Sequence, residues 1–80
     1  MKNIILTFNG GESRLHPEKG CNYMIAKLPG DEELYAEIVI PEDCDDTDYF
    51  GYDDLKTEII RQASEKGIPA ETLVFPYDED

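Results

Sequence analysis

The alternation of apolar and polar residues predicts a β-hairpin in the first half of the chain. Between residues 34 and 40 every second side chain would face inward, namely Leu34, Ala36, Ile38 and Ile40. The side chains between them, Tyr35, Glu37 and Val39, would face outward. Residues 22–28 alternate more loosely, and Pro29-Gly30-Asp31 between the two segments is a turn signal.

Two further strands are predicted near the ends of the chain. Residues 4–8 are rich in β-forming side chains and stop at Asn9-Gly10-Gly11, a strong turn signal. Residues 9–20 are polar and turn-prone, which predicts a loop. Residues 72–75 form a last short strand, which Pro76 would end.

A helical period begins near residue 52. The apolar residues then recur at helical spacing, as Tyr52, Leu55, Ile59 and Ala63. Asp53 and Asp54 fall in the first turn, where the helix dipole favours acidic side chains. Lys66-Gly67 predicts the end of the helix, with a base in the last turn and glycine just after it.

The predicted order β-β-β-α-β defines an α+β fold, a mostly antiparallel sheet with one helix packed on one face. We expect one domain over residues 1–80, because so short a chain supports a single small core, and we expect the acidic tail at 76–80 to be frayed. If the last strand joins the second hairpin strand in parallel, the crossover should be right-handed.

Negative charge is concentrated in the middle of the chain. The formal net charge is −12, and residues 28–55 hold eleven of the nineteen acidic residues and none of the seven lysines and arginines. A field of one sign steers a basic partner, and aromatic rings among the acids can hold its cations. The predicted partner-binding residues are Asp31, Glu32, Glu33, Tyr35, Glu37, Glu42, Asp43, Asp45, Asp46, Asp48, Tyr49, Asp53 and Asp54.

Phe50 and Tyr52 lie in the same stretch and have two interpretations. They either belong to the core at the start of the helix or expose a ring to the partner. Solubility alone would also explain surface acid, although it calls for mixed signs spread over the whole surface.

The residues give little support to catalysis. His16 with Cys21 would suit a small hydrolase, but an exposed loop histidine and a small structural cysteine explain the pair as well. No phosphate-binding loop or nucleophile elbow occurs. We therefore expect a protein that is not an enzyme and needs no cofactor.

No metal site is expected either. His16, Cys21 and Cys44 do not have the spacing of a zinc site. Asp46, Asp48 and Gly51 fit positions 1, 3 and 6 of an EF-hand loop, but Phe50 and Thr57 occupy positions that need oxygen ligands. Loose binding of Ca²⁺ or Mg²⁺ by the acidic cluster stays open.

The sequence shows no secretory segment and no apolar run long enough for a membrane span. We expect a cytoplasmic protein with reduced thiols, as a monomer or small homo-oligomer. The acidic balance argues for a basic protein partner and against direct binding of nucleic acid or membrane.

In size, charge and layout the chain resembles the small acidic inhibitors that phages and mobile elements direct against host defence, notably anti-CRISPR proteins of the nucleic-acid-mimic kind. The residues that carry this resemblance are Asp31 to Glu33, Glu42 to Asp48, Asp53-Asp54 and Asp78 to Asp80. The resemblance implies a DNA mimic that occupies the basic nucleic-acid channel of a CRISPR effector or similar defence nuclease, without a cofactor.

Two other functions remain open. The stretch from Tyr49 to Leu55 resembles the aromatic-glycine-acidic start of the helix in barstar-like inhibitors, which implies an immunity protein or antitoxin that neutralises a basic nuclease toxin. In this chain, however, the hairpin precedes the helix. The third reading is an acidic adaptor domain without an inhibitory role.

Overall fold

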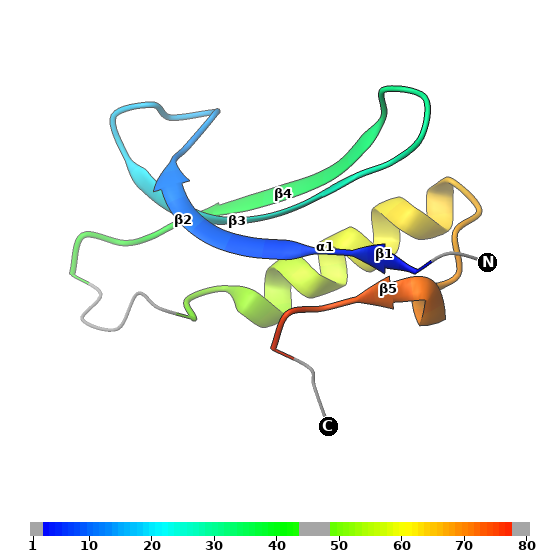
Figure 1. Ribbon diagram of the computed structural model, residues 1–80. Coiled ribbons are helices and arrows are strands. Elements are labelled where there is room, and N and C mark those ends of the chain that lie inside the picture. Colours follow the sequence, from blue (N-terminus) through cyan, green and yellow to red (C-terminus); the bar gives the residue numbers. More distant parts are fainter. Residues whose placement is uncertain (1–2, 44–48, 78–80) are drawn as a thin grey trace.

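The computed structural model describes residues 3–43 and 49–77, within which the chain forms five strands, one α-helix and a 3₁₀ helix. The strands are β1 (Ile4–Ile5), β2 (Thr7–Glu12), β3 (Gly20–Lys27), β4 (Glu33–Val39) and β5 (Leu73–Val74). The α-helix, α1, spans Tyr52–Glu65, and the 3₁₀ helix η1 spans Ala70–Thr72. One helix lies against one face of the sheet (Figure 1), which confirms the predicted α+β class.

The predicted hairpin is formed by β3 and β4. The two strands are antiparallel, and their register runs from Cys21 opposite Val39 to Lys27 opposite Glu33. The turn closes where the Leu28 N–H donates to the Glu32 carbonyl at 2.9 Å. The turn signal at residues 29–31 is thereby confirmed.

The N-terminal strand departs from the prediction. Instead of ending at residue 8, it is divided into β1 and β2, and β2 continues through Asn9-Gly10-Gly11 to Glu12. The predicted turn at residues 9–11 is wrong, because Gly10 pairs with Asn22 and Gly11 with Cys21. A Cβ on Gly10 would lie 3.2 Å from Asn22 Oδ1, so this glycine leaves space for a buried amide rather than for a turn.

The last strand pairs with the first one. β5 runs parallel to β1, with Ile4 opposite Leu73 and Ile5 opposite Val74. The arrangement considered from the sequence, with this strand beside the second hairpin strand, is therefore wrong. The predicted bounds were also too wide, since Thr72 belongs to η1 and β5 ends at Val74.

The outer edge of β4 is covered by one side chain of α1. Gln62 accepts a hydrogen bond from the Tyr35 N–H at 3.2 Å and donates one to the Tyr35 carbonyl at 2.8 Å. The amide thus takes the place of a neighbouring strand at this residue. Covering an edge in this way opposes pairing with another strand there.

We expect Gln62→Ala to lower the free energy of unfolding by about 1–2 kcal/mol, because both backbone groups of Tyr35 lose a partner. Chemical denaturation measures the change. Gln62→Met is the matched variant, since it keeps the aliphatic stem but forms neither hydrogen bond. Wild-type stability in Gln62→Met would contradict the prediction and assign the contribution to packing.

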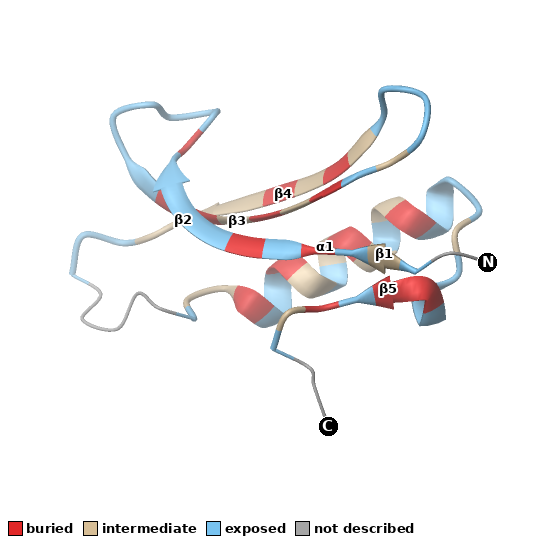
Figure 2. Cartoon of the chain, in the orientation of Figure 1, coloured by how far each residue is buried: buried red, intermediate tan, exposed pale blue. Residues whose placement is uncertain are grey.

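The hydrophobic core lies between the sheet and α1 (Figure 2). Leu6, which lies between β1 and β2, Met24 of β3 and Leu34 of β4 belong to it, and each is at most 1% exposed. The helix contributes the predicted stripe, Tyr52, Leu55, Ile59 and Ala63. Leu34 and Ala36 of β4 are buried in this core as predicted, and Ile38 is half-buried and packs against it. Ile40, which follows the end of β4, is also half-buried.

A glycine with a positive φ lies beside each end of α1. Gly67, at a φ of 79°, follows the C-cap residue Lys66, and the Ile68 N–H donates back to the Ala63 carbonyl at 2.8 Å. This bond, with that of the Gly67 N–H to Ser64, is a Schellman motif and confirms the predicted helix end. Gly51, at a φ of 73°, is the N-cap.

Candidate partner-binding surface

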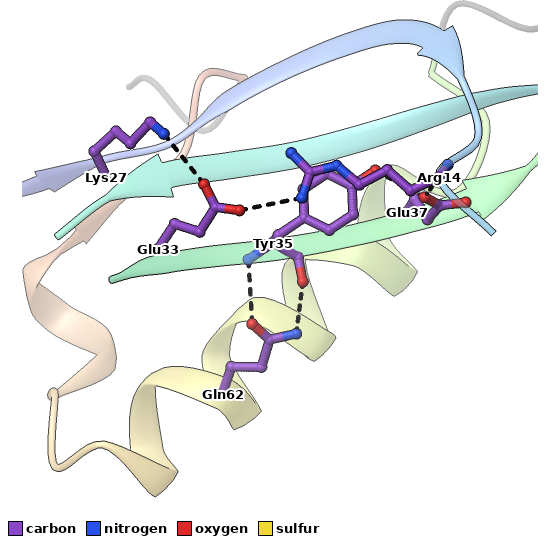
Figure 3. A network of polar contacts seen from close by, with 6 residues as sticks. All are labelled: Arg14, Lys27, Glu33, Tyr35, Glu37 and Gln62. Atoms are coloured by element: carbon purple, nitrogen blue, oxygen red, sulfur yellow. Dashed lines mark hydrogen bonds and ion pairs between the residues drawn. The ribbon is translucent and has the colours of Figure 1, made fainter. Parts of the chain in front are cut away.

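The face of the sheet away from α1 carries a polar network built on Glu33, Tyr35 and Glu37 of β4 (Figure 3). Glu33 accepts hydrogen bonds from Arg14 at 3.1 Å and from Lys27 at 3.3 Å. The hydrogen bond from the Arg14 guanidinium, followed by that from Lys27, lowers the pKa of the Glu33 carboxyl. Two bases from outside the acidic stretch therefore neutralise this residue.

Glu37 holds the connection between β2 and β3 against the sheet. Its carboxylate accepts hydrogen bonds from the Ser13 hydroxyl, from the Arg14 N–H at 2.8 Å and from the Tyr35 hydroxyl at 2.8 Å. Burial acts to raise the pKa of Glu37, but these hydrogen bonds outweigh it and lower the pKa. The Arg14 guanidinium lies 3.8 Å from the centre of the Tyr35 ring. The three β4 residues are thus occupied by partners within the chain.

The remaining predicted acids divide between the two ends of the molecule. Asp31 and Glu32 lie in the β3–β4 turn, where Glu32 pairs with Lys66 at 3.3 Å. The end of β4 and the start of α1 lie together at the opposite end (Figure 1). Four exposed acids without an ion pair in the described chain belong to this second end: Glu42, Asp43, Asp53 and Asp54. Asp45, Asp46 and Asp48 lie outside the described residues.

Two exposed tyrosines accompany these acids. Tyr49 is 59% exposed and Tyr77 is 51% exposed, and their ring centres lie 5.0 Å apart in an edge-to-face arrangement. Tyr77 also packs against Phe8 and Tyr52, with ring centres 5.7 and 5.3 Å apart, and its N–H donates to the Tyr52 hydroxyl. A hollow of about 270 Å³ lies between the two exposed rings and β2. Tyr52 is a core residue, whereas Phe50 is half-buried, so both interpretations stay open for the Phe50 ring.

Sequence reasoning identified Tyr49 but missed Tyr77. The available signal was the size of its ring, because aromatic side chains contribute strongly to cores and interfaces. We name the exposed residues at this end the acidic-aromatic surface: Glu42, Asp43, Tyr49, Asp53, Asp54 and Tyr77.

His16 and Cys21 differ in their exposure. His16 lies in an exposed turn, where its N–H donates to the Ser13 hydroxyl at 2.9 Å. Cys21 is 1% exposed. Burial, assisted by the Glu37 carboxylate, raises the pKa of its thiol, which opposes formation of the nucleophilic thiolate.

The part of the chain that the structure describes contains no group of three or more His, Cys, Asp or Glu side chains placed to hold a metal ion. Gly51 and Thr57, two positions of the tested EF-hand pattern, are the N-cap and an internal residue of α1. The pattern therefore does not form a calcium loop at these residues.

The chain matches no protein-family model, no curated protein and no solved structure. Among the described residues no helix is both long and apolar enough to span a membrane. Function must therefore be inferred from the geometry and charge of the surface.

Proposed function

We propose that this protein is an inhibitor that binds the basic, nucleic-acid-binding surface of another protein and blocks it as a DNA mimic. The partner class is a CRISPR effector or similar defence nuclease. The observation that carries the proposal is the acidic-aromatic surface, where four exposed carboxylates that pair with no base among the described residues accompany two exposed tyrosine rings.

Charge supports the proposal because the acids of this surface remain available after the intrachain pairs are formed. Elsewhere Arg14, Lys27 and Lys66 neutralise acids of the same stretch of sequence. Surfaces that hold nucleic acid concentrate lysine and arginine to neutralise phosphates. Carboxylates spaced over one end of a small domain can occupy the same cations.

The two tyrosines support the proposal because their rings offer contacts to a partner that carboxylates alone do not. Tyr77 is held by Phe8 and Tyr52, and it in turn contacts Tyr49, so the exposed rings are positioned before a partner arrives. Pre-positioned rings cost little entropy on binding, and they attract lysine and arginine through cation–π contacts.

The test begins with capture of the partner from the native host and its identification by mass spectrometry. We expect nucleic acid and this protein to compete for one site on the partner. Raising salt from about 50 to 300 mM should weaken binding by about tenfold or more, because exposed charges are screened. Simultaneous binding of both ligands would contradict the proposal, and a toxin nuclease as the partner would favour the immunity function.

Charge-reversal variants test whether the acidic-aromatic surface contacts the partner. Asp43→Lys should weaken binding to the captured partner by about threefold to tenfold, because it removes one attraction and adds one repulsion. Glu71→Lys makes the same charge change at the exposed 3₁₀ helix and serves as the control. Equal effects of the two variants would show that net charge, rather than the acidic-aromatic surface, determines affinity.

A further inference from the structure

A separate cleft opens where β1 leaves the antiparallel sheet. β2 pairs with β3 as far as Thr7 opposite Ile25, but β1 turns away and pairs with β5. The cleft that results between β1 and the end of β3 has a volume of about 830 Å³. Its lining residues come from β1, the end of β3, the β3–β4 turn and the segment after α1. The β3–β4 turn and the C-terminal end of α1 lie at the opposite end of the molecule from the start of α1 (Figure 1).

Aliphatic side chains form most of the cleft, and they continue into the core. Ile4, Leu28 and Ile68 line it and also pack against the buried core cluster. Ile5 lines it as well and is 68% exposed. An apolar group placed here would cover aliphatic surface that water now contacts, which is the main source of affinity in small-molecule sites.

Bases outnumber acids among the residues that line the cleft, whereas acids outnumber bases in the whole chain. Acidic residues outnumber bases 19 to 7 in the sequence. The cleft, however, is lined by two lysines, Lys27 and Lys66, and by one acid, Glu32. Lys66 bonds Glu32 and Lys27 bonds Glu33, each at 3.3 Å. Each ammonium group has three N–H donors, so each retains donors for a further anion.

We propose that the cleft binds a small amphipathic anion, an unbranched alkyl chain with a carboxylate head. The chain would lie along Ile4, Ile5 and Ile68, and the head would bind Lys27 and Lys66. The volume is within the range of about 300–1,000 Å³ that is typical of small-molecule sites. The negative charge of the rest of the protein opposes anions at long range, and salt near 150 mM screens that repulsion.

Calorimetry with sodium octanoate, decanoate and dodecanoate tests the alkyl part on the full chain. Affinity should rise about threefold to fourfold for each added methylene, as expected when the chain is buried. Chemical shifts in ¹⁵N-labelled protein should change at Ile5, Leu28 and Ile68 rather than at Tyr49. Affinity independent of chain length, or shifts confined to other residues, would overturn the proposal.

Lysine variants test the anionic head. Lys27→Met and Lys66→Met should each weaken decanoate binding by about fivefold to tenfold, since methionine keeps the apolar stem but removes the ammonium. Lys19→Met makes the same change at an exposed position outside the cleft and should leave binding unchanged. Binding of decyl phosphate as tightly as decanoate would show that the cleft accepts anionic heads in general rather than carboxylates alone. Equal binding of decyltrimethylammonium, or decanoate binding unaffected by both cleft variants, would refute the site.

Discussion

Replacing Gly51 with alanine is expected to lower the free energy of unfolding by about 2–5 kcal/mol. The residue has a φ of 73°, a left-handed conformation that costs an L-residue about 1–2 kcal/mol. A Cβ built there would also lie 2.4 Å from Ile38 Cγ2, so β4 or the start of α1 must move. Such overpacking adds about 1–3 kcal/mol. Chemical denaturation with an unchanged slope against denaturant would measure the loss.

Gly67 provides a matched control for Gly51. Its φ is 79°, but a Cβ there meets nothing within 4 Å. Gly67→Ala should therefore cost only the backbone part, about 1–2 kcal/mol. In an Ile38→Ala background the cost of Gly51→Ala should fall to about the same value, because the steric part disappears. If both glycines cost equally in the wild-type background, the clash with Ile38 does not contribute.

Gly51 also connects this stability argument to the proposed surface. The residue joins Tyr49 and the first turn of α1, where Asp53 and Asp54 lie. The Asn22 side chain donates to the Phe50 carbonyl at 3.0 Å and fixes the same turn against β3. A shift at Gly51 would move the exposed ring and the exposed carboxylates relative to each other. Partner affinity should therefore fall with stability in Gly51→Ala and remain in Gly67→Ala.

The sequence predicted those elements whose signals are local. The hairpin and α1 depend on periodicity, a Pro-Gly turn and a glycine after the last helical turn, all within a few residues of one another. Asn9-Gly10-Gly11 misled the prediction because the two glycines lie inside a strand rather than in a turn. Neither Gly10 nor Gly11 has a positive φ, and both lie opposite the side chains of β3 that crowd the strand.

The pairing of β5 with β1 could not be predicted from local patterns. The two strands are only two residues each, and they are separated by nearly the whole chain. At Tyr35 the edge of β4 is occupied by the Gln62 side chain, which is a contact between a helix side chain and a strand backbone. Neither residue carries a sequence signal for such a contact.

The candidate surface was only partly accessible to sequence reasoning. Counting charge along residues 28–55 gives a single sign, but Arg14, Lys27 and Lys66 come from elsewhere in the sequence and pair with acids of that stretch. Sequence distance hides such pairs. It also hides the approach of Tyr77 to Tyr49, which joins residues on opposite sides of α1 in the sequence.

Glu37→Ala is expected to lower the free energy of unfolding by about 2 kcal/mol. Three donors, from Ser13, Arg14 and Tyr35, would lose a charged acceptor, and the partial exposure of the site keeps the cost moderate. Because the folded protein lowers the pKa of Glu37, its stabilising effect is present above the ordinary value of 4.5 and is lost as the pH falls through the lowered pKa. The difference between wild type and variant should therefore shrink on acidification below about pH 4.5. Glu42→Ala, at an exposed acid that forms no ion pair with another described residue, should change stability by less than about 0.5 kcal/mol.

Glu37→Ala should also expose Cys21. This thiol is buried on the sheet face that carries Glu37, and the connection from Ser13 to Lys19, which Glu37 holds in place, enters β3 just before it. In a Cys44→Ser background, Glu37→Ala should speed reaction of Cys21 with a thiol reagent by about tenfold or more, as local opening becomes easier. Loss of the nearby carboxylate also favours the thiolate, so Glu37→Gln is the control that removes the charge but keeps an acceptor oxygen. An equal increase in both variants would mean that charge, rather than opening of the connection, controls the reactivity of Cys21.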